Sequence, residues 1–121
     1  MRNHLKLQVW HKARDLTLVI YELTRSFPRE ERYTLVSQIR RSAVSVVSNI
    51  AEGSARRSDR EFARFLDMAL GSAAELDAQL DISAGLGFVE EERAQEVIGD
   101  LIEVKKMLAG LLTSVLRRIA N

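Results

Sequence analysis

Residues 9–28, VWHKARDLTLVIYELTRSFP, decide the fold class of this chain. Apolar side chains recur here in alternating steps of four and three residues: Val9, Ala13, Leu16, Ile20, Leu23 and Phe27. This spacing places them all on one face of an α-helix, as in the seam of a helical bundle. Pro28 disfavours continuation of the helix, because its ring fixes the backbone and removes a hydrogen-bond donor. The stretch therefore predicts an amphipathic helix that ends near Phe27.

The same spacing recurs in three further segments. A second helix is predicted from about Glu31 to Glu52, with Gly53 in the position of a C-terminal glycine cap. Its apolar face continues the pattern of the first helix: Leu35, Ile39, Ala43, Val46 and Ile50. Ser58 and Glu61 then form a capping box, which predicts the start of a third helix.

The last two helices have equally clear apolar faces. The third carries Phe62, Phe65, Ala69, Ala73, Leu76 and Leu80, and Gly85 and Gly87 are expected to end it. The fourth is predicted to open at residues 90–92, three glutamates that suit a helix N-terminus, and to end with Arg117 and Arg118. Its apolar face consists of Val97, Leu101, Val104, Leu108, Leu111, Val115 and Ile119.

Four amphipathic helices with short connections predict an all-α, antiparallel, up-down-up-down four-helix bundle. The 121 residues fit one domain spanning residues 1–121. A hydrophobic fraction of 46% and a charged fraction of 29% are typical of globular proteins and exclude a disordered or fibrous chain. Gly71, Gly99 and Gly110 lie inside predicted helices, where we expect them to mark close helix–helix approach.

The cellular location and the possible chemistry of the protein are constrained mainly by motifs that the sequence lacks. The first 15 residues do not resemble a signal peptide, and no segment has the roughly 20 apolar residues that span a bilayer, so we expect a cytoplasmic protein without membrane contact. The sequence has no cysteine, which excludes disulfides, thiolate zinc sites and a cysteine nucleophile. The Glu-x-x-His motif of di-iron bundles and glycine-rich phosphate loops are also absent. We therefore expect no enzymatic activity, no cofactor and no metal.

One enzymatic alternative remains open. Carboxylates on facing helices can bind Mg²⁺ and a nucleotide phosphate, as in all-α pyrophosphohydrolases. The candidates are the acidic residues of the fourth helix with a pair on the third: Glu90, Glu91, Glu92, Glu96, Asp100, Glu103, Asp77 and Asp81. A solvent-exposed acidic face that complements the helix dipole is the simpler interpretation.

Charge is distributed unevenly along the chain. Residues 1–64 hold 13 basic and 7 acidic residues, a net of +6, whereas residues 65–121 hold 5 and 10, a net of −5. In the predicted topology, the N-terminus, the loop between helices two and three and the C-terminus meet at one end. That end is predicted to be basic, with Arg2, Lys6, Lys12 and Arg14 beside the arginines named below, against Asp59 and Glu61. The opposite end is predicted to be acidic, with Arg93 against the carboxylates named above. A basic end can bind phosphate backbones. The candidate contacts are Arg56, Arg57, Arg60, Arg64, Arg117 and Arg118.

Residues 37–53, SQIRRSAVSVVSNIAEG, carry a recognisable motif, together with Val9-Trp10-x-Lys12-Ala13 and Gly71-Ser72-x-x-Glu75-Leu76-x-x-Gln79-Leu80. From about residue 7 to 115 the chain resembles the bacterial four-helix-bundle family known as 23S rRNA intervening sequence proteins or S23 ribosomal proteins. The resemblance implies ring-forming homo-oligomers, pentamers where described, and attaches no enzymatic activity. The family is also similar to the accessory protein of diversity-generating retroelements, a basic pentameric barrel that binds nucleic acid and a reverse transcriptase.

The motif positions are expected to have a structural or interface role, because polar groups on packed helices are usually satisfied by partners. They are Trp10, Gln38, Arg41, Ser45, Asn49, Glu52, Gly53, Gly71, Ser72, Glu75 and Gln79. The hypothesis that follows is a non-enzymatic cyclic scaffold whose basic end binds RNA or DNA, or an enzyme that acts on nucleic acid. A protein–protein scaffold without nucleic-acid binding is the alternative, and a metal-dependent nucleotide hydrolase is a remote one.

Overall fold

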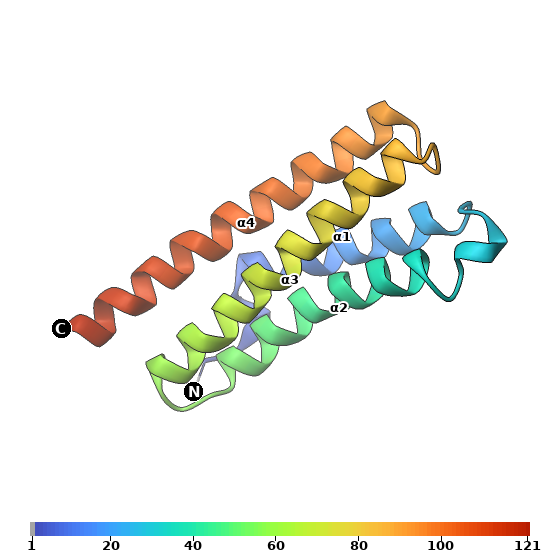
Figure 1. Ribbon diagram of the computed structural model, residues 1–121. Helices are drawn as coiled ribbons and strands as arrows, with labels where there is room; N and C mark the ends of the chain where they lie inside the picture. Colours follow the sequence, from blue (N-terminus) through green and yellow to red (C-terminus); the bar gives the residue numbers. More distant parts are fainter. Residues whose placement is uncertain (1) are drawn as a thin grey trace.

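The computed structural model describes residues 2–121 and is built from four long helices (Figure 1). They are α1 (Gln8–Thr24), α2 (Leu35–Ser54), α3 (Asp59–Gly85) and α4 (Glu91–Ala120), with two short 3-10 turns, η1 (His4–Lys6) and η2 (Arg29–Glu31). Each helix packs against its neighbours in sequence, and α1 also packs against α4. The four helices therefore surround one core, and the predicted all-α four-helix fold is confirmed.

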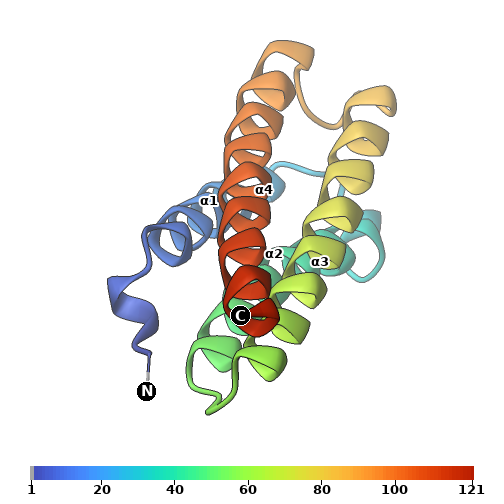
Figure 2. The same ribbon diagram turned by 90° about the vertical axis from the view of Figure 1, so that its left-hand side faces the viewer.

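Successive helices run in opposite directions, so the connections gather at two ends of the molecule (Figures 1 and 2). The N-terminal residues, the α2–α3 connection and the end of α4 lie at one end. The α1–α2 and α3–α4 connections lie at the other end. Residues that are far apart in sequence thereby become neighbours at each end.

The core consists of the apolar faces that the sequence predicts. Ile20, Ile39, Phe62 and Leu101 are fully buried in it, one from each helix. Four of the predicted positions are only partly buried and pack against its edge: Leu23, Leu35, Leu111 and Ile119. Burial of this continuous apolar surface is the main stabilising contribution to the fold. None of the helices in residues 2–121 is long and apolar enough to cross a membrane.

The connection between α1 and α2 differs from the prediction. The first helix ends at Thr24, and Pro28 opens the separate turn η2. The second helix begins at Leu35 rather than near Glu31, because Thr34 has a non-helical backbone (φ −119°, ψ −98°). The predicted start of α2 was therefore four residues too early, and a longer connection reaches beyond the helices at this end.

The serine half of the predicted capping box is present at the start of α3. The Ser58 hydroxyl accepts a hydrogen bond from the backbone N–H of Glu61 over 3.1 Å. This bond satisfies one of the free N–H groups in the first turn of the helix. At the other end, α3 stops at Gly85, and Gly87 adopts a left-handed backbone with φ +78°.

Gly53 is not a cap, and here the prediction was wrong. It lies inside α2, which continues to Ser54, and it is buried. A Cβ atom on Gly53 would lie 2.7 Å from Cβ of Phe65 and 3.1 Å from Cδ1 of Phe62. The missing side chain therefore lets α2 and α3 approach closely.

The interpretation of the other helical glycines is also corrected. Gly71, Gly99 and Gly110 are exposed, and a Cβ atom at each would meet nothing within 4 Å. They lie on helix faces that point away from the core, so they do not mark close helix approach within the chain.

Candidate nucleic-acid interface

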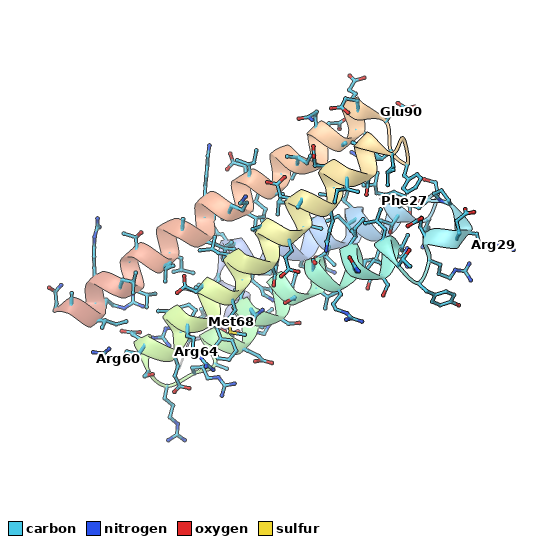
Figure 3. All side chains as sticks on the ribbon, viewed as in Figure 1. Phe27, Arg29, Arg60, Arg64, Met68 and Glu90 are labelled. Carbon is cyan, nitrogen blue, oxygen red and sulfur yellow. The ribbon has the colours of Figure 1, made fainter. Side chains whose placement is uncertain are left out.

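Arginines from three separate segments meet at the end that holds both chain termini. Arg2 comes from the N-terminal residues, Arg56 and Arg57 follow α2, and Arg118 belongs to the last turn of α4. Figure 3 shows Arg60 and Arg64 on the first turns of α3 at this same end. We call this region the arginine-rich end and define it by Arg2, Arg56, Arg57, Arg60, Arg64, Arg117 and Arg118.

A cavity of about 680 Å³ opens at the arginine-rich end. Its lining combines four arginines with three apolar side chains: Arg2, Arg56, Arg57, Arg118, Leu7, Phe62 and Leu111. Guanidinium groups around an apolar floor can bind anionic oxygens, because each presents several N–H donors in a plane. Nothing in this lining is acidic.

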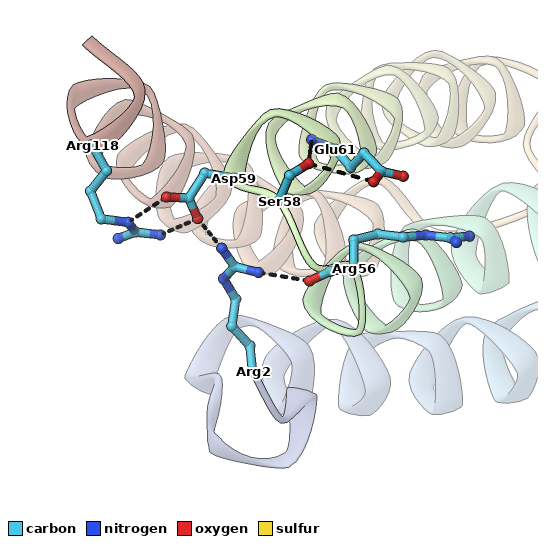
Figure 4. A network of polar contacts seen from close by, with 6 residues as sticks. All are labelled: Arg2, Arg56, Ser58, Asp59, Glu61 and Arg118. Carbon is cyan, nitrogen blue, oxygen red and sulfur yellow. Dashed lines mark hydrogen bonds and ion pairs between the residues drawn. The ribbon is translucent and has the colours of Figure 1, made fainter. Parts of the chain in front are cut away.

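Asp59 organises the arginines next to this cavity (Figure 4). Its carboxylate accepts from the guanidinium of Arg2 and also from Arg118, with 3.3 Å between Arg118 Nε and Asp59 Oδ2. Arg2 Nη1 donates a further hydrogen bond to the backbone carbonyl of Arg56 over 3.0 Å. Two cations therefore share one carboxylate, and a positive charge is left over.

Arg2 also contacts the apolar floor of the cavity. Its guanidinium lies 4.5 Å from the centre of the Phe62 ring, a cation–π distance. Burial, and after it the positive charge of Arg118, lowers the pKa of Arg2. Because an arginine pKa is so far above neutrality, Arg2 keeps its charge, and crowding of like charges favours the arrival of an anion.

The predicted phosphate contacts fall into two groups. Arg56, Arg57 and Arg118, which were predicted to share one end of the molecule, line the cavity together with Arg2, which was not among the predicted phosphate contacts. Arg64 lies outside the cavity, with its guanidinium 5.4 Å from the ring of Phe65. The predicted topology already places Arg2 at the same end as Asp59, but the contact between the two side chains is visible only in the structure.

The predicted arginines also differ in how many contacts their guanidinium groups make. Arg56 lies 4.9 Å from the centre of the Phe65 ring and 3.8 Å from the carboxylate of Glu52. Arg57, Arg60 and Arg117 are exposed and make no ion pair within residues 2–121. Exposed, unpaired arginines are the ones most easily recruited by a phosphate backbone.

Most motif residues gather in a second hollow, between α2 and α3. It has a volume of about 260 Å³ and is lined by Gln38, Arg41, Ser42, Ser45, Ser72, Glu75 and Gln79. The hydroxyls of Ser45 and Ser72 are 2.8 Å apart and join the two helices, and Asn49 Nδ2 donates to the Ser45 carbonyl over 2.9 Å. These contacts give Ser45, Asn49 and Ser72 a structural role in the chain.

The other residues of this hollow have no such contacts. No hydrogen bond or ion pair within the described chain involves the side chains of Gln38, Arg41 or Glu75. The Oε1 atom of Gln79 is buried and lacks a hydrogen-bond partner there. Three of these side chains, Gln38, Arg41 and Glu75, are exposed to solvent, and only the Oε1 atom of Gln79 is a buried polar atom without a partner.

Trp10 is separate from both hollows. It packs against the edge of the core, with the rings of His4 and His11 against it at 4.6 and 5.0 Å between ring centres. Its Nε1 atom is buried without a hydrogen-bond partner among residues 2–121. Trp10 therefore contributes to packing at the core edge.

The opposite end is less acidic than predicted. The glutamates of residues 90–92 do lie there, but so does the α1–α2 connection with Arg25, Arg29 and Arg32 (Figure 3). The prediction counted the α3–α4 side alone, and the longer connection explains the error. This end therefore has an acidic side on α3 and α4, whereas the α1–α2 connection carries mixed charge, its three arginines standing beside Glu22, Glu30 and Glu31.

The acidic residues considered for metal binding do not form a cluster. Asp77 on α3 makes an ion pair with Lys105 on α4, with 3.3 Å between Oδ2 and Nζ. Within residues 2–121, no three histidine or carboxylate side chains come together in a way that could hold a metal ion.

Comparison with known proteins links this architecture to one family. A family model described as 23S rRNA-intervening sequence protein matches residues 5–110. A crystal structure from Bacteroides thetaiotaomicron VPI-5482 is also similar, with a TM-score of 0.80 and 25% sequence identity, covering 86% of this chain and 97% of that one. That structure is described as a protein with unknown function from the S23 ribosomal protein family. No curated protein matches the sequence significantly.

Proposed function

Because this chain belongs to the 23S rRNA-intervening sequence protein family, we propose that it is a non-enzymatic scaffold that binds the phosphate backbone of nucleic acid at its arginine-rich end. The observation that carries the proposal is the cavity lined by four arginines and no acidic residue, with only the carboxylates of Asp59 and Glu52 paired to those arginines from outside the lining. Phosphate contacts of this kind position a nucleic acid without reading its sequence. The aromatic side chains nearby, Phe62 and Phe65, are buried, so they offer no platform for bases.

The proposal is tested by fluorescence anisotropy with a labelled structured RNA and a duplex DNA, from low to physiological salt. We expect the logarithm of affinity to fall linearly with the logarithm of salt concentration. Replacing Arg56, Arg57, Arg60 and Arg64 with Ala should weaken binding of both probes about equally. The log–log slope should become shallower by up to about 0.9 for each phosphate contact removed.

A matched pair of variants distinguishes the effect of charge at the arginine-rich end from the effect of net charge on nucleic-acid binding. The double variant Arg57→Ala/Arg60→Ala and the double variant Arg93→Ala/Lys106→Ala each remove two positive charges from exposed positions. Only the first should flatten the salt dependence. Equal losses from both variants would mean that binding depends on net charge alone, and an unchanged affinity in the first would refute the proposed interface.

We further infer that the scaffold is a cyclic homo-oligomer, with the pentamer as the expected form from the family resemblance. The unpaired groups of the α2–α3 hollow support a subunit contact there, and two large apolar side chains on the outer side of α3, Met68 and Ile82, are 47% and 51% exposed. In a cyclic assembly every arginine-rich end would face the same side of the ring. That arrangement would present several phosphate-binding sites to one nucleic acid.

Native mass spectrometry tests the assembly directly. We expect a mass that is a multiple of the 13.7 kDa protomer. Arg41→Ala/Glu75→Ala should lower that multiple, because it removes the unpaired charges of the hollow. A wild-type protein that stays at 13.7 kDa over a wide concentration range would eliminate the ring but not the nucleic-acid proposal.

A protein–protein scaffold without nucleic-acid binding is the second candidate, favoured by the same unpaired hollow. It predicts no change in anisotropy with either probe, even at low salt.

A further inference from the structure

The α1–α2 connection carries a second group of arginines, at the end opposite the arginine-rich end. A cavity of about 370 Å³ lies there, lined by Thr24, Arg25, Phe27, Pro28, Arg29, Arg32, Val36 and Arg40. Four of these side chains are arginines and none is acidic. Three carboxylates lie close by along the chain: Glu22 pairs with Arg25 of this lining over 3.4 Å, Glu31 accepts from Thr34 over 3.0 Å, and Glu30 makes no ion pair among residues 2–121. Arg29, Arg32 and Arg40 form no ion pair within the same residues.

Arg40 is held firmly between α1 and α2. Its Nε donates to the hydroxyl of Thr24 over 2.9 Å, and its Nη2 donates to the carbonyl of Tyr21 over 3.2 Å. The guanidinium also lies 4.5 Å from the centre of the Tyr21 ring. All these partners are neutral, and no carboxylate within residues 2–121 forms an ion pair with Arg40. A partly buried guanidinium without a carboxylate partner costs folding free energy. Because the hydrogen bonds of Arg40 fix its orientation, an anion that binds there loses less entropy in ordering the side chain.

Two tyrosines border the same arginines. An adjoining hollow of about 480 Å³ is lined by Tyr21 and Tyr33 and shares Arg32, Val36 and Arg40 with the first cavity. One face of the Tyr21 ring is covered by Arg40, but Tyr33 is 84% exposed. An aromatic ring left in water beside a cluster of arginines is the arrangement that binds single-stranded nucleic acid, because every base has a flat face that can stack.

We propose that this arginine–tyrosine cleft, defined by Arg29, Arg32, Arg40 and Tyr33, binds an unpaired nucleotide of a single-stranded nucleic acid. A phosphate lies among the three guanidinium groups, and the base stacks on Tyr33. A paired base cannot occupy this position, since both its faces are covered within the helix stack. The site is independent of the arginine-rich end and would stand if that interface failed.

The test uses the 121-residue chain and two labelled probes. One is an oligouridylate of about 12 nucleotides, within the site sizes of single-strand binders. The other is a fully paired RNA hairpin, closed by a non-nucleotide linker, with the same number of phosphates. Tyr33→Ala should lower the affinity for the oligouridylate about tenfold and leave the affinity for the hairpin unchanged. Tyr33→Phe should restore binding, because phenylalanine keeps the stacking face. Arg29→Gln/Arg32→Gln should also lower oligouridylate affinity and make its log–log salt slope shallower by about 1.4, as expected for two contacts to a single strand.

Controls decide between this site and other uses of the surface. Arg93→Gln/Lys106→Gln removes the same charge elsewhere and should leave oligouridylate binding unchanged. Circular dichroism melting and sedimentation of each variant report its folding and assembly. The proposal is overturned if Tyr33→Ala and Arg29→Gln/Arg32→Gln bind the oligouridylate as the wild type does, or if hairpin binding falls equally. It is also overturned if these variants change the oligomeric mass, or if polyglutamate displaces the oligouridylate at lower concentration than unlabelled oligouridylate does.

Discussion

Gly53 shows how much a single position can control when two helices cross closely. It is buried inside α2, and the space that a side chain would fill is taken by Phe62 and Phe65 of α3. Inside a helix, glycine costs about 1 kcal/mol relative to alanine in intrinsic propensity. That cost is offset here by the packing of two helices that could not otherwise come so near.

Alanine substitutions at two glycines should therefore have opposite effects. Gly53→Ala should lower the free energy of unfolding by about 1–2 kcal/mol, because overpacking costs more than the gain in helix propensity. Gly71→Ala should raise it by about 0.5–1 kcal/mol, since the new methyl group meets nothing within 4 Å. Urea unfolding of both variants measures the difference, and shifts of the same sign would contradict this account.

Asp59 is the residue that joins the chain ends to the start of α3. Asp59→Asn should remove its ion pairs with Arg2 and Arg118 and its favourable charge at the helix N-terminus. We expect a loss of about 1 kcal/mol in stability together with tighter RNA binding, because two guanidinium groups are released. The salt slope should become steeper by up to about 0.9 for each arginine released.

Asp67→Asn is the matched control for this variant. Asp67 is also an exposed acidic residue of α3, and it makes no ion pair within residues 2–121. The same change in net charge should leave stability nearly unchanged and the salt slope as in the wild type. Weaker RNA binding by Asp59→Asn would show that Asp59 orients the arginines rather than restraining them.

At the scale of the helices, the sequence predicts those features that are determined within a single helix. Ile39 is fully buried because its position in the apolar repeat of α2 already puts it on the inner face. The start of α2 was predicted too early because Thr34 has a non-helical backbone, which the residues around it do not indicate. Gly53 was misassigned for a related reason: its role lies in its contact with Phe65, a residue of another helix.

The candidate sites follow the same rule. Arg56, Arg57 and Arg118 could be grouped from the sequence, because an antiparallel topology is enough to bring their segments to one end. Arg40 could not, since its role rests on Thr24 and Tyr21 of the neighbouring helix. Contacts between elements depend on their register and rotation, and a single sequence does not specify these.

The cap of α3 makes an element-scale prediction. Ser58→Ala should lower the free energy of unfolding by about 1 kcal/mol, because the N–H of Glu61 loses its acceptor. Ser48→Ala, at an exposed position inside α2, should be close to neutral or slightly stabilising. Thermal or urea unfolding distinguishes the two, and equal effects would mean that the cap contributes nothing measurable.

For the whole molecule, the position of charge matters more than its sum. A formal charge of +1 gives little indication of a partner, yet one end gathers seven arginines and the other end sets the carboxylates of α3 and α4 beside the mixed charges of the α1–α2 connection. Helix α4 alone has 30 residues and so spans about 45 Å. That length is several times the screening distance of about 8 Å at physiological salt.

Neutralising the distant acidic side should therefore have little effect on the arginine-rich end. Glu90→Gln/Glu91→Gln/Glu92→Gln raises the formal charge of the chain from +1 to +4. We expect the RNA affinity at physiological salt to stay within about twofold of the wild type, with a larger gain at low salt where screening is weak. A gain of tenfold or more at physiological salt would show that the far end also contacts the probe.

The ion pairs of Arg2 and Arg118 with the carboxylate of Asp59 hold the two ends of the chain close together. The four helices also pack in a closed ring, so the packing does not depend on which helix comes first in the sequence. Each helix touches the one before it and the one after it, and α1 and α4 close the circle. A chain whose ends are joined by a short linker and which is opened within residues 86–89 would keep every helix between the same two neighbours. Such a circular permutant should fold, and its new ends would leave the arginine-rich end unobstructed by any fused tag.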